Sequence, residues 1–104
     1  MLRIYPVALE MVRDVSRLCE VIAEKDRDHA RQLRRSSMSV VLNLGEGSGS
    51  TGGTRRARYE NALGSTRETL CGLRAAAAVG YIPALPPQVL DRHLHIMNVL
   101  RKLT

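Results

Sequence analysis

The sequence predicts an all-α protein, folded as an antiparallel up-down-up-down four-helix bundle. Apolar residues recur at the helical spacing i, i+3, i+4 and i+7 in four segments, which short turns separate. Only 3% of the residues are aromatic, and Phe and Trp are absent. The core must therefore be aliphatic, which suits helix packing better than a β-sandwich. Because the chain has 104 residues, we expect one domain over residues 1–104.

The first helix is predicted over residues 6–25, with Pro6 in the first turn, where proline is tolerated. Charged residues occupy its outer face, and the inner stripe comprises Ala8, Met11, Val12, Val15, Leu18, Cys19 and Ile22. The polar run EKDRD then turns the chain, and Asp26 is the expected N-cap of the next helix.

The second helix, predicted over residues 27–46, changes character along its length. Its N-terminal half carries a basic stripe of Arg27, Arg31, Arg34 and Arg35, since these positions fall on one helical face. Its C-terminal half, MSVVLNLG, is apolar or small on almost every side. Such a helix is enclosed by more than one neighbour, and in a domain this small one neighbour can belong to another subunit.

The stretch SVVLNLGEGSGSTGGT can be interpreted as a phosphate cradle, a flexible linker or the end of a buried helix. A phosphate cradle needs a preceding strand and a following Lys-Ser/Thr pair, and neither is present. We therefore expect Gly47 to end the second helix as a left-handed C′ residue. A Gly/Ser/Thr loop over residues 47–54 should follow, with Thr54 as the N-cap of the third helix.

The third helix is predicted over residues 55–79 and should end at Gly80. Four consecutive alanines at residues 75–78 permit a close helix approach without side-chain entropy cost. The run YIPALPP turns the chain, and Pro86 and Pro87 begin a fourth helix over residues 87–103. Its apolar stripe includes His93, which we expect to be a partly buried core or interface histidine.

The chain is basic, with 16 Lys and Arg against 10 Asp and Glu and a formal net charge of +6, which suggests a polyanionic partner. On the second helix, Arg34 and Arg35 have no acidic neighbour at i±3 or i±4, and Arg31 can reach Asp28; a further cluster of arginines lies at the start of the third helix. We expect them to bind the phosphates of nucleic acid, a solvated helix face being the alternative. With so few aromatics, recognition should use backbone and shape rather than base stacking. The predicted nucleic-acid-binding residues are Arg27, Arg31, Arg34, Arg35, Arg55, Arg56 and Arg58.

Two polar residues, Asn43 and Glu46, end the apolar half of the second helix. They could form a ligand-binding pair, but a structural polar network with Ser65 and Glu68 is the preferred interpretation, in which Glu46 pairs with an arginine of the third helix or meets Ser65.

No set of carboxylate, His or Cys residues has catalytic or metal-ligand spacing. His93 and His95 lie on different helical faces, and Cys19 and Cys71 are expected to be reduced, buried thiols. We therefore expect no enzyme activity, no metal, no cofactor and no small-molecule substrate.

No apolar run approaches the roughly 18 residues of a membrane span. The N-terminal segment carries charge too early and too often for a signal peptide. We therefore expect a soluble, cytoplasmic protein that does not associate with membranes.

Several motifs resemble the four-helix-bundle family of 23S rRNA intervening-sequence proteins. The matching segments are QLRR at 32–35, Ser39-Val40, NLGEG at 43–47, Gly64-Ser65 with Glu68, and VGY at 79–81. The resemblance extends from about Val7 to Leu103, and this sequence has Gly45 where the family has Ala. A similar protein is the accessory variability determinant of diversity-generating retroelements. The resemblance implies a barrel-like homopentamer with a basic, nucleic-acid-binding surface and, in the retroelement case, a reverse transcriptase partner.

Two hypotheses about function follow. The first is a non-enzymatic, oligomeric accessory protein that binds DNA or RNA through sequence-tolerant phosphate contacts and docks a reverse transcriptase. The second is an oligomeric protein-interaction scaffold, encoded by an rRNA intervening sequence, whose basic surface binds an acidic protein and not nucleic acid.

Overall fold

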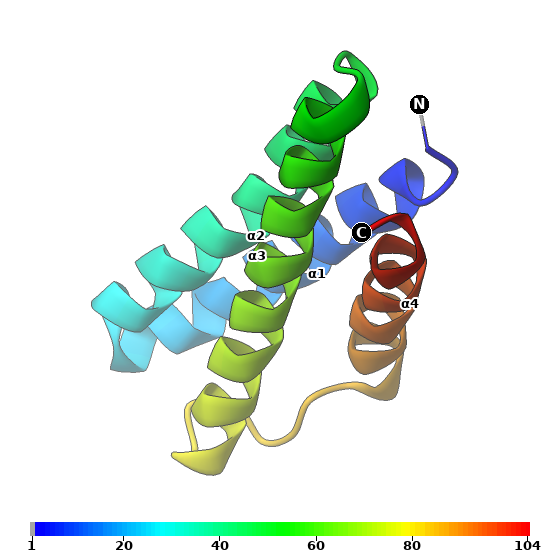
Figure 1. The fold of residues 1–104 in the computed structure, drawn as a ribbon. Coiled ribbons are helices and arrows are strands. Elements are labelled where there is room, and N and C mark those ends of the chain that lie inside the picture. The colour runs from blue at the N-terminus through cyan, green and yellow to red at the C-terminus, as the bar shows by residue number, and fades with distance from the viewer. Residues whose placement is uncertain (1) are drawn as a thin grey trace.

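The computed structural model describes residues 2–104, and within them the chain forms four α-helices and no strand (Figure 1). The helices are α1 (Tyr5–Lys25), α2 (Arg27–Ser48), α3 (Gly52–Ala78) and α4 (Pro87–Leu103). The all-α, four-helix prediction is therefore confirmed. Each helix packs against two others: α2 lies between α1 and α3, while α4 contacts α3 and α1. Figure 1 shows α2 returning alongside α1, and α3 returning alongside α2.

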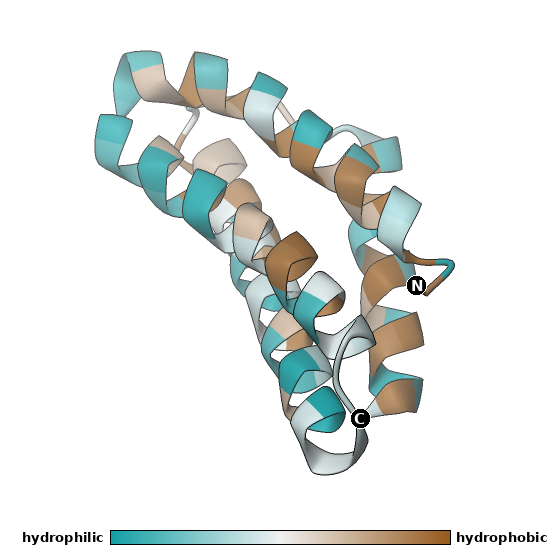
Figure 2. Cartoon of the chain, turned by 90° about the horizontal axis from the view of Figure 1, so that it is seen from above, coloured by the Kyte–Doolittle hydropathy of each residue, from teal (hydrophilic) through white to brown (hydrophobic). Residues whose placement is uncertain are grey.

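The core is aliphatic, as the composition requires. Hydrophobic and hydrophilic residues alternate along the helices in Figure 2, as expected of amphipathic segments. The largest fully buried apolar side chains are Met11, Ile22, Leu44, Leu73, Ile96 and Leu100. All four helices contribute to this set, so each helix is held by burial of its own apolar stripe.

Two helix ends form as the sequence predicts. The Asp26 side chain caps α2 by accepting a hydrogen bond from the His29 backbone N–H at 3.0 Å, and it also accepts one from the Tyr81 hydroxyl at 3.0 Å. These two hydrogen bonds lower the pKa of Asp26 from its ordinary value. Gly80 has a φ of +84° and follows α3, where the Tyr81 N–H bonds the Ala76 carbonyl at 2.8 Å.

The predicted bounds of the loop over residues 47–54 are wrong at both ends, because α2 ends at Ser48 and α3 begins at Gly52. Gly47 does not have a positive φ, because α2 continues through it to Ser48. The Tyr59 ring packs so closely there that a Cβ on Gly47 would lie 2.4 Å from its Cε1 atom. Gly47 is thus needed for a close helix approach and not for a turn.

The third helix begins earlier than predicted, at Gly52 with a φ of +55°. Thr51 occupies the N-cap position without a side-chain capping hydrogen bond, and Thr54 lies inside the helix. The Ser50 N–H and the Arg55 Nε–H both donate to the Gly47 carbonyl, at 3.1 and 3.2 Å. These bonds satisfy the end of α2 and leave only a short connection to α3.

A half-buried ion pair joins α4 to α1. The Arg92 guanidinium donates to Asp14 at 2.5 Å, and the Asp14 side chain is only 9% exposed. Hydrogen bonding and charge attraction from Asp14 raise the pKa of Arg92 above its ordinary value.

The next residue of α4, His93, is fully buried. Its Nδ1–H donates to the Val89 carbonyl at 2.8 Å, and its Nε2 has no hydrogen-bond partner within residues 2–104.

A Gly47→Ala variant should be less stable than the wild type by about 1–3 kcal/mol, because the new methyl group overlaps the Tyr59 ring. Gly45→Ala is the matched control: no atom lies within 4 Å of its new Cβ, and alanine favours the helix, so it should stabilise by about 0.5–1 kcal/mol. Urea unfolding of both variants measures the two changes. Equal effects at both positions would contradict the close approach of Tyr59.

Acidification should destabilise the fold through His93. Burial lowers the pKa of His93 from its ordinary value of 6.5, although the Val89 carbonyl and Asp14 oppose the shift. The unfolded chain then binds the proton more readily, so the free energy of unfolding should fall as the pH drops through about 6.5.

Denaturant unfolding at about pH 7 and about pH 5 measures this loss. In a His93→Gln variant the loss between the two pH values should be smaller, whereas His95→Gln, at an exposed position of α4, should behave like the wild type. An unchanged pH dependence in His93→Gln would show that another group is responsible.

Candidate functional site

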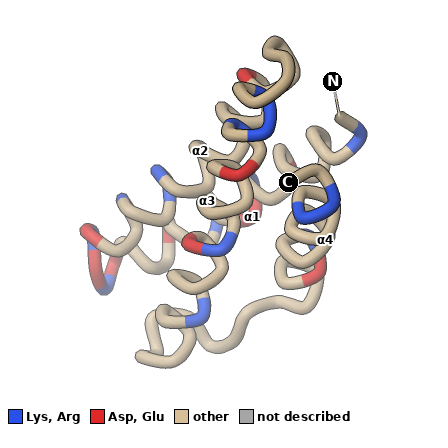
Figure 3. Tube along the Cα trace, in the orientation of Figure 1, with Lys and Arg blue, Asp and Glu red and all other residues tan. Residues whose placement is uncertain are grey.

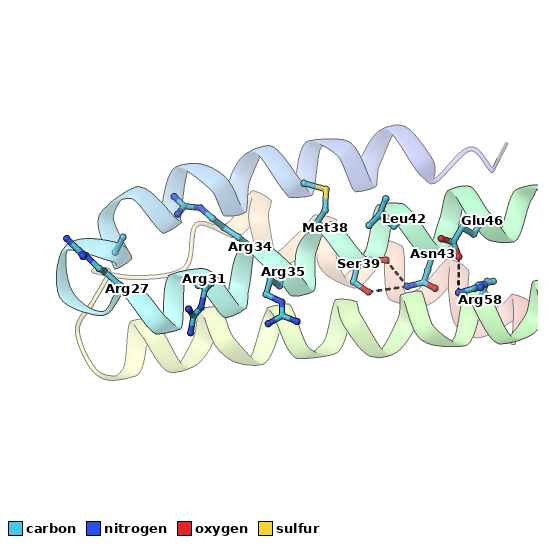
Figure 4. Close-up of a pocket in the computed structure, with 11 residues that line it drawn as sticks. Arg27, Arg31, Arg34, Arg35, Met38, Ser39, Leu42, Asn43, Glu46 and Arg58 are labelled. Atoms are coloured by element: carbon cyan, nitrogen blue, oxygen red, sulfur yellow. Dashed lines mark hydrogen bonds and ion pairs between the residues drawn. The ribbon is translucent and has the colours of Figure 1, made fainter.

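A surface groove of about 910 Å³ runs along the outward face of α2 (Figure 4). We call it the α2 groove. Its two halves differ in chemistry: arginines line the half formed by the start of α2, and the exposed apolar pair Met38 and Leu42 lines the other half. These two side chains are 48% and 59% exposed. The full lining is Ala23, Arg27, Arg31, Arg34, Arg35, Met38, Ser39, Leu42, Asn43, Glu46 and Arg58.

The basic stripe predicted on the second helix lies in this groove (Figure 4), and all four of its arginines are exposed. Figure 3 shows Lys and Arg positions recurring along the first half of α2. Only Arg31 has an acidic partner within residues 2–104, namely Asp28, and both side chains of that ion pair are largely exposed. An exposed pair of this kind contributes little to stability, and a competing anion can replace it. The stripe therefore presents three arginines without acidic partners and one that is weakly engaged.

The arginines at the start of α3 are placed differently from the prediction. Arg55 donates from Nε to the Gly47 carbonyl at 3.2 Å, and so caps the end of α2. Arg58 forms an ion pair with Glu46 at 2.8 Å and lines the α2 groove. Only Arg56 is exposed without a recorded partner in residues 2–104. The Glu46–Arg58 pair is the pairing of Glu46 with an arginine of the third helix that the sequence predicts, whereas the contact of Arg55 with a backbone carbonyl of α2 depends on tertiary packing and was not predicted.

The polar residues at the end of α2 are only partly joined into a network. Asn43 donates from Nδ2 to the Ser39 carbonyl and hydroxyl at 2.9 and 3.1 Å, and the Ser39 hydroxyl bonds the Ser65 hydroxyl at 2.9 Å. Glu46 does not join them, since it pairs with Arg58 at the surface. Glu68 does not join them either, and is exposed on α3.

A second hydroxyl pair extends this contact along α2 and α3. The Ser36 and Thr69 hydroxyls lie 2.7 Å apart, and the Thr69 hydroxyl is 2.7 Å from the Ser65 carbonyl. The sequence analysis missed Ser36, Ser39 and Thr69. Their helical spacing, three residues apart on α2 and four between Ser65 and Thr69 on α3, is the signal that could have revealed them.

A second groove, of about 520 Å³, follows this line of hydroxyls between α2 and α3, and we call it the seam groove. Arg35 and Ser39 line both grooves, so the two grooves are adjacent on α2. Figure 4 shows Arg31 and Arg35 pointing from α2 toward α3, which is the side of the seam groove. The lining of the seam groove is Gln32, Arg35, Ser36, Ser39, Ser65 and Glu68.

The thiols and imidazoles do not form a reactive cluster in residues 2–104. Cys19 is buried, as predicted, and burial raises the pKa of its thiol despite the nearby charge of Arg34. Cys71 is exposed, contrary to the prediction, because its position on α3 faces away from the core. The His29 Nε2–H donates to the Gly72 carbonyl at 2.7 Å. No group of three or more His, Cys, Asp or Glu residues within 2–104 could hold a metal ion.

None of the helices in residues 2–104 is both long enough and apolar enough to span a membrane. The candidate functional surface consists of the α2 groove and the adjacent seam groove.

A comparison with known families matches residues 1–102 to the 23S rRNA-intervening sequence proteins. The chain belongs to this family. The family resemblance seen in the motifs is thus confirmed. A comparison with curated proteins gives no match.

The fold of this intervening-sequence protein is also found in a solved structure. A crystal structure of a protein of unknown function from the S23 ribosomal protein family of Bacteroides thetaiotaomicron is similar, with a TM-score of 0.83. The two sequences are 18% identical, and the match covers 96% of each chain. This likeness supports the helical fold. The family description names an intervening sequence of 23S rRNA and no activity. The function of this member must therefore be inferred from the residues on its surface.

Proposed function

We propose that this intervening-sequence protein is a non-enzymatic, cytoplasmic accessory protein that binds nucleic acid as an oligomer. The observation that carries the proposal is the basic stripe in the α2 groove, where Arg27, Arg34 and Arg35 have no acidic partner within residues 2–104. Uncompensated arginines side by side repel one another, and a phosphate backbone relieves that repulsion while releasing its own counterions.

Phosphate contacts suit the rest of the composition. The formal net charge is +6, and the chain has three Tyr but no Phe or Trp with which to stack bases. Arginine binds phosphate in a bidentate manner, and such contacts position a protein without reading sequence. We therefore propose binding that tolerates sequence and depends strongly on salt. Arg56 extends this surface, while Arg55 and Arg58 act mainly within the fold.

Self-association is proposed through the apolar half of the α2 groove. Met38 and Leu42 lie one helical turn apart, and both are about half exposed, an arrangement typical of a contact surface. The family resemblance supports a homopentameric barrel of antiparallel bundles. An oligomer presents one basic stripe per copy, so several stripes can bind the same nucleic acid and increase the avidity. The similarity to the retroelement accessory protein adds a reverse transcriptase as a proposed partner.

One observation favours a second candidate function. The same groove that holds the arginines also exposes Met38 and Leu42, a combination that fits an acidic amphipathic helix of another protein. In this alternative the protein is an oligomeric scaffold for an acidic protein partner, and nucleic acid does not bind.

Reversing charge in the basic stripe separates the two functions. The purified protein should bind duplex DNA and structured RNA at low salt, with affinity falling by about 0.9 log units per log unit of salt for each phosphate neutralised on duplex DNA. An Arg34→Glu/Arg35→Glu variant should bind about tenfold more weakly or worse, with a shallower salt slope. Fluorescence anisotropy across a salt series measures affinity, and light scattering gives the mass of the same samples.

The matched control is Arg67→Glu/Arg74→Glu, which reverses two exposed arginines of α3 outside both grooves. It should lower affinity much less than the stripe variant. A folded oligomer that fails to bind any nucleic acid at low salt would refute the proposal and favour the scaffold. Equal losses in the two variants would show that net charge, and not the groove, governs binding.

A further inference from the structure

Two carboxylates line the grooves: Glu46, which pairs with Arg58, and Glu68, which phosphate binding does not explain. The Glu68 side chain lines the seam groove and also a smaller cavity beside it, of about 290 Å³. No Lys, Arg or His within residues 2–104 forms an ion pair with its carboxylate. A lone carboxylate next to a basic stripe would repel the phosphates that the stripe attracts. In the free protein, water solvates this exposed carboxylate, but a strand bound in the groove would displace that water. The carboxylate would then need a neutral partner that donates a hydrogen bond, because an ionised carboxylate can only accept.

The geometry of the grooves indicates where that partner comes from. Arg35 belongs to both the α2 groove and the seam groove, and it points from α2 toward α3. A nucleic-acid strand whose phosphate lies on Arg35 would place the attached sugar over the seam groove. The polar side chains that line the groove there include those of Gln32, Ser65 and Glu68.

We infer that the seam groove selects RNA over DNA, because Glu68 accepts a hydrogen bond from a ribose 2′-hydroxyl. This inference rests on the proposed function and names its substrate class. The 2′-hydroxyl is the donor by which a protein distinguishes RNA from DNA at a given position. With DNA the carboxylate would lose water and gain no donor, while its repulsion of the phosphates would remain.

The surroundings of Glu68 support a neutral ligand over a cation. Arg35 lines the same groove, and Arg31 points toward it from α2, so a cation would be repelled. The neighbouring hydroxyls are already engaged: Ser39 bonds Ser65, and Ser36 bonds Thr69. Glu68 and Gln32 thus offer the hydrogen-bonding groups for an incoming ribose.

The test compares one structured RNA hairpin with the same sequence in which every 2′-hydroxyl is replaced by fluorine. Both adopt A-form geometry, carry the same phosphates and present the same bases, so they differ in the donor alone. The full-length wild type should bind the hydroxyl form about five- to tenfold more tightly, as expected for one hydrogen bond to a charged acceptor. Anisotropy titrations at fixed salt give the ratio of the two affinities.

In a Glu68→Ala variant the ratio should fall to about one, while the affinity for the fluorinated hairpin stays the same or rises because a negative charge is removed. The matched control is Glu60→Ala, an exposed carboxylate on α3 outside both grooves, which should keep the wild-type ratio. Glu68 is exposed, so the thermal unfolding midpoint of its variant should match that of the control.

A wild type that binds both hairpins equally would overturn this inference and leave the proposed function intact. So would a preference for the hydroxyl form that survives Glu68→Ala, because the donor would then be recognised by another residue. A protein that binds neither hairpin at low salt refutes the proposed function, and the inference with it.

Discussion

Two glycines allow α2 and α3 to approach so closely that side chains of one helix fill the space beside the backbone of the other. The Tyr59 ring of α3 lies against Gly47 of α2, and Leu33 of α2 lies against Gly72 of α3, where an added Cβ would be 2.6 Å from the Leu33 Cδ2 atom. The two contacts lie near opposite ends of the helix pair. In one, a side chain of α3 packs on the backbone of α2, and in the other, a side chain of α2 packs on the backbone of α3. Together they fix both the separation of the two helices and their register.

Between these glycine contacts, hydroxyl groups of α2 and α3 satisfy one another's hydrogen-bonding capacity. Ser36 meets Thr69 and Ser39 meets Ser65, so polar groups at a close helix contact are hydrogen-bonded to one another. With the inner face of α2 occupied in this way, its arginines lie at the surface, and Arg31 and Arg35 point toward α3. The grooves on either side of Arg35 are thus a consequence of how tightly α2 packs against α3.

The charged residues divide into those that serve the fold and those left at the surface. Arg92 holds α4 to α1 through the buried Asp14, and Arg55 caps α2, so these arginines are committed to structure. Arg58 is committed to Glu46, though at an exposed site where an ion pair contributes little. Among the charges without an ion-pair partner in residues 2–104, Arg27, Arg34, Arg35 and Glu68 lie in the grooves, whereas others such as Arg67 and Arg74 lie elsewhere on the surface. The grouping in the grooves, and not the net charge of +6 alone, is the basis of the proposed function.

The sequence by itself determined the four helices and the position of the basic stripe. The Asp26 cap, the Gly80 stop and the outward direction of Arg27, Arg31, Arg34 and Arg35 all follow from helical periodicity and local backbone preference, which act within a few residues. Tertiary structure alone decided that Gly47 lies within a helix, since the Tyr59 ring packed against it comes from α3.

Tertiary structure likewise decided the partner of Arg55, which arginine of α3 pairs with Glu46, the hydroxyl pairs between α2 and α3, and the lack of an ion-pair partner for Glu68 within residues 2–104. The physical reason is the same in each case. These contacts join residues on different helices, and their geometry is set by how closely α2 and α3 approach, which depends on side-chain volume at a few positions. Periodicity specifies which face of a helix is buried, but it carries no information about which atoms meet across the contact.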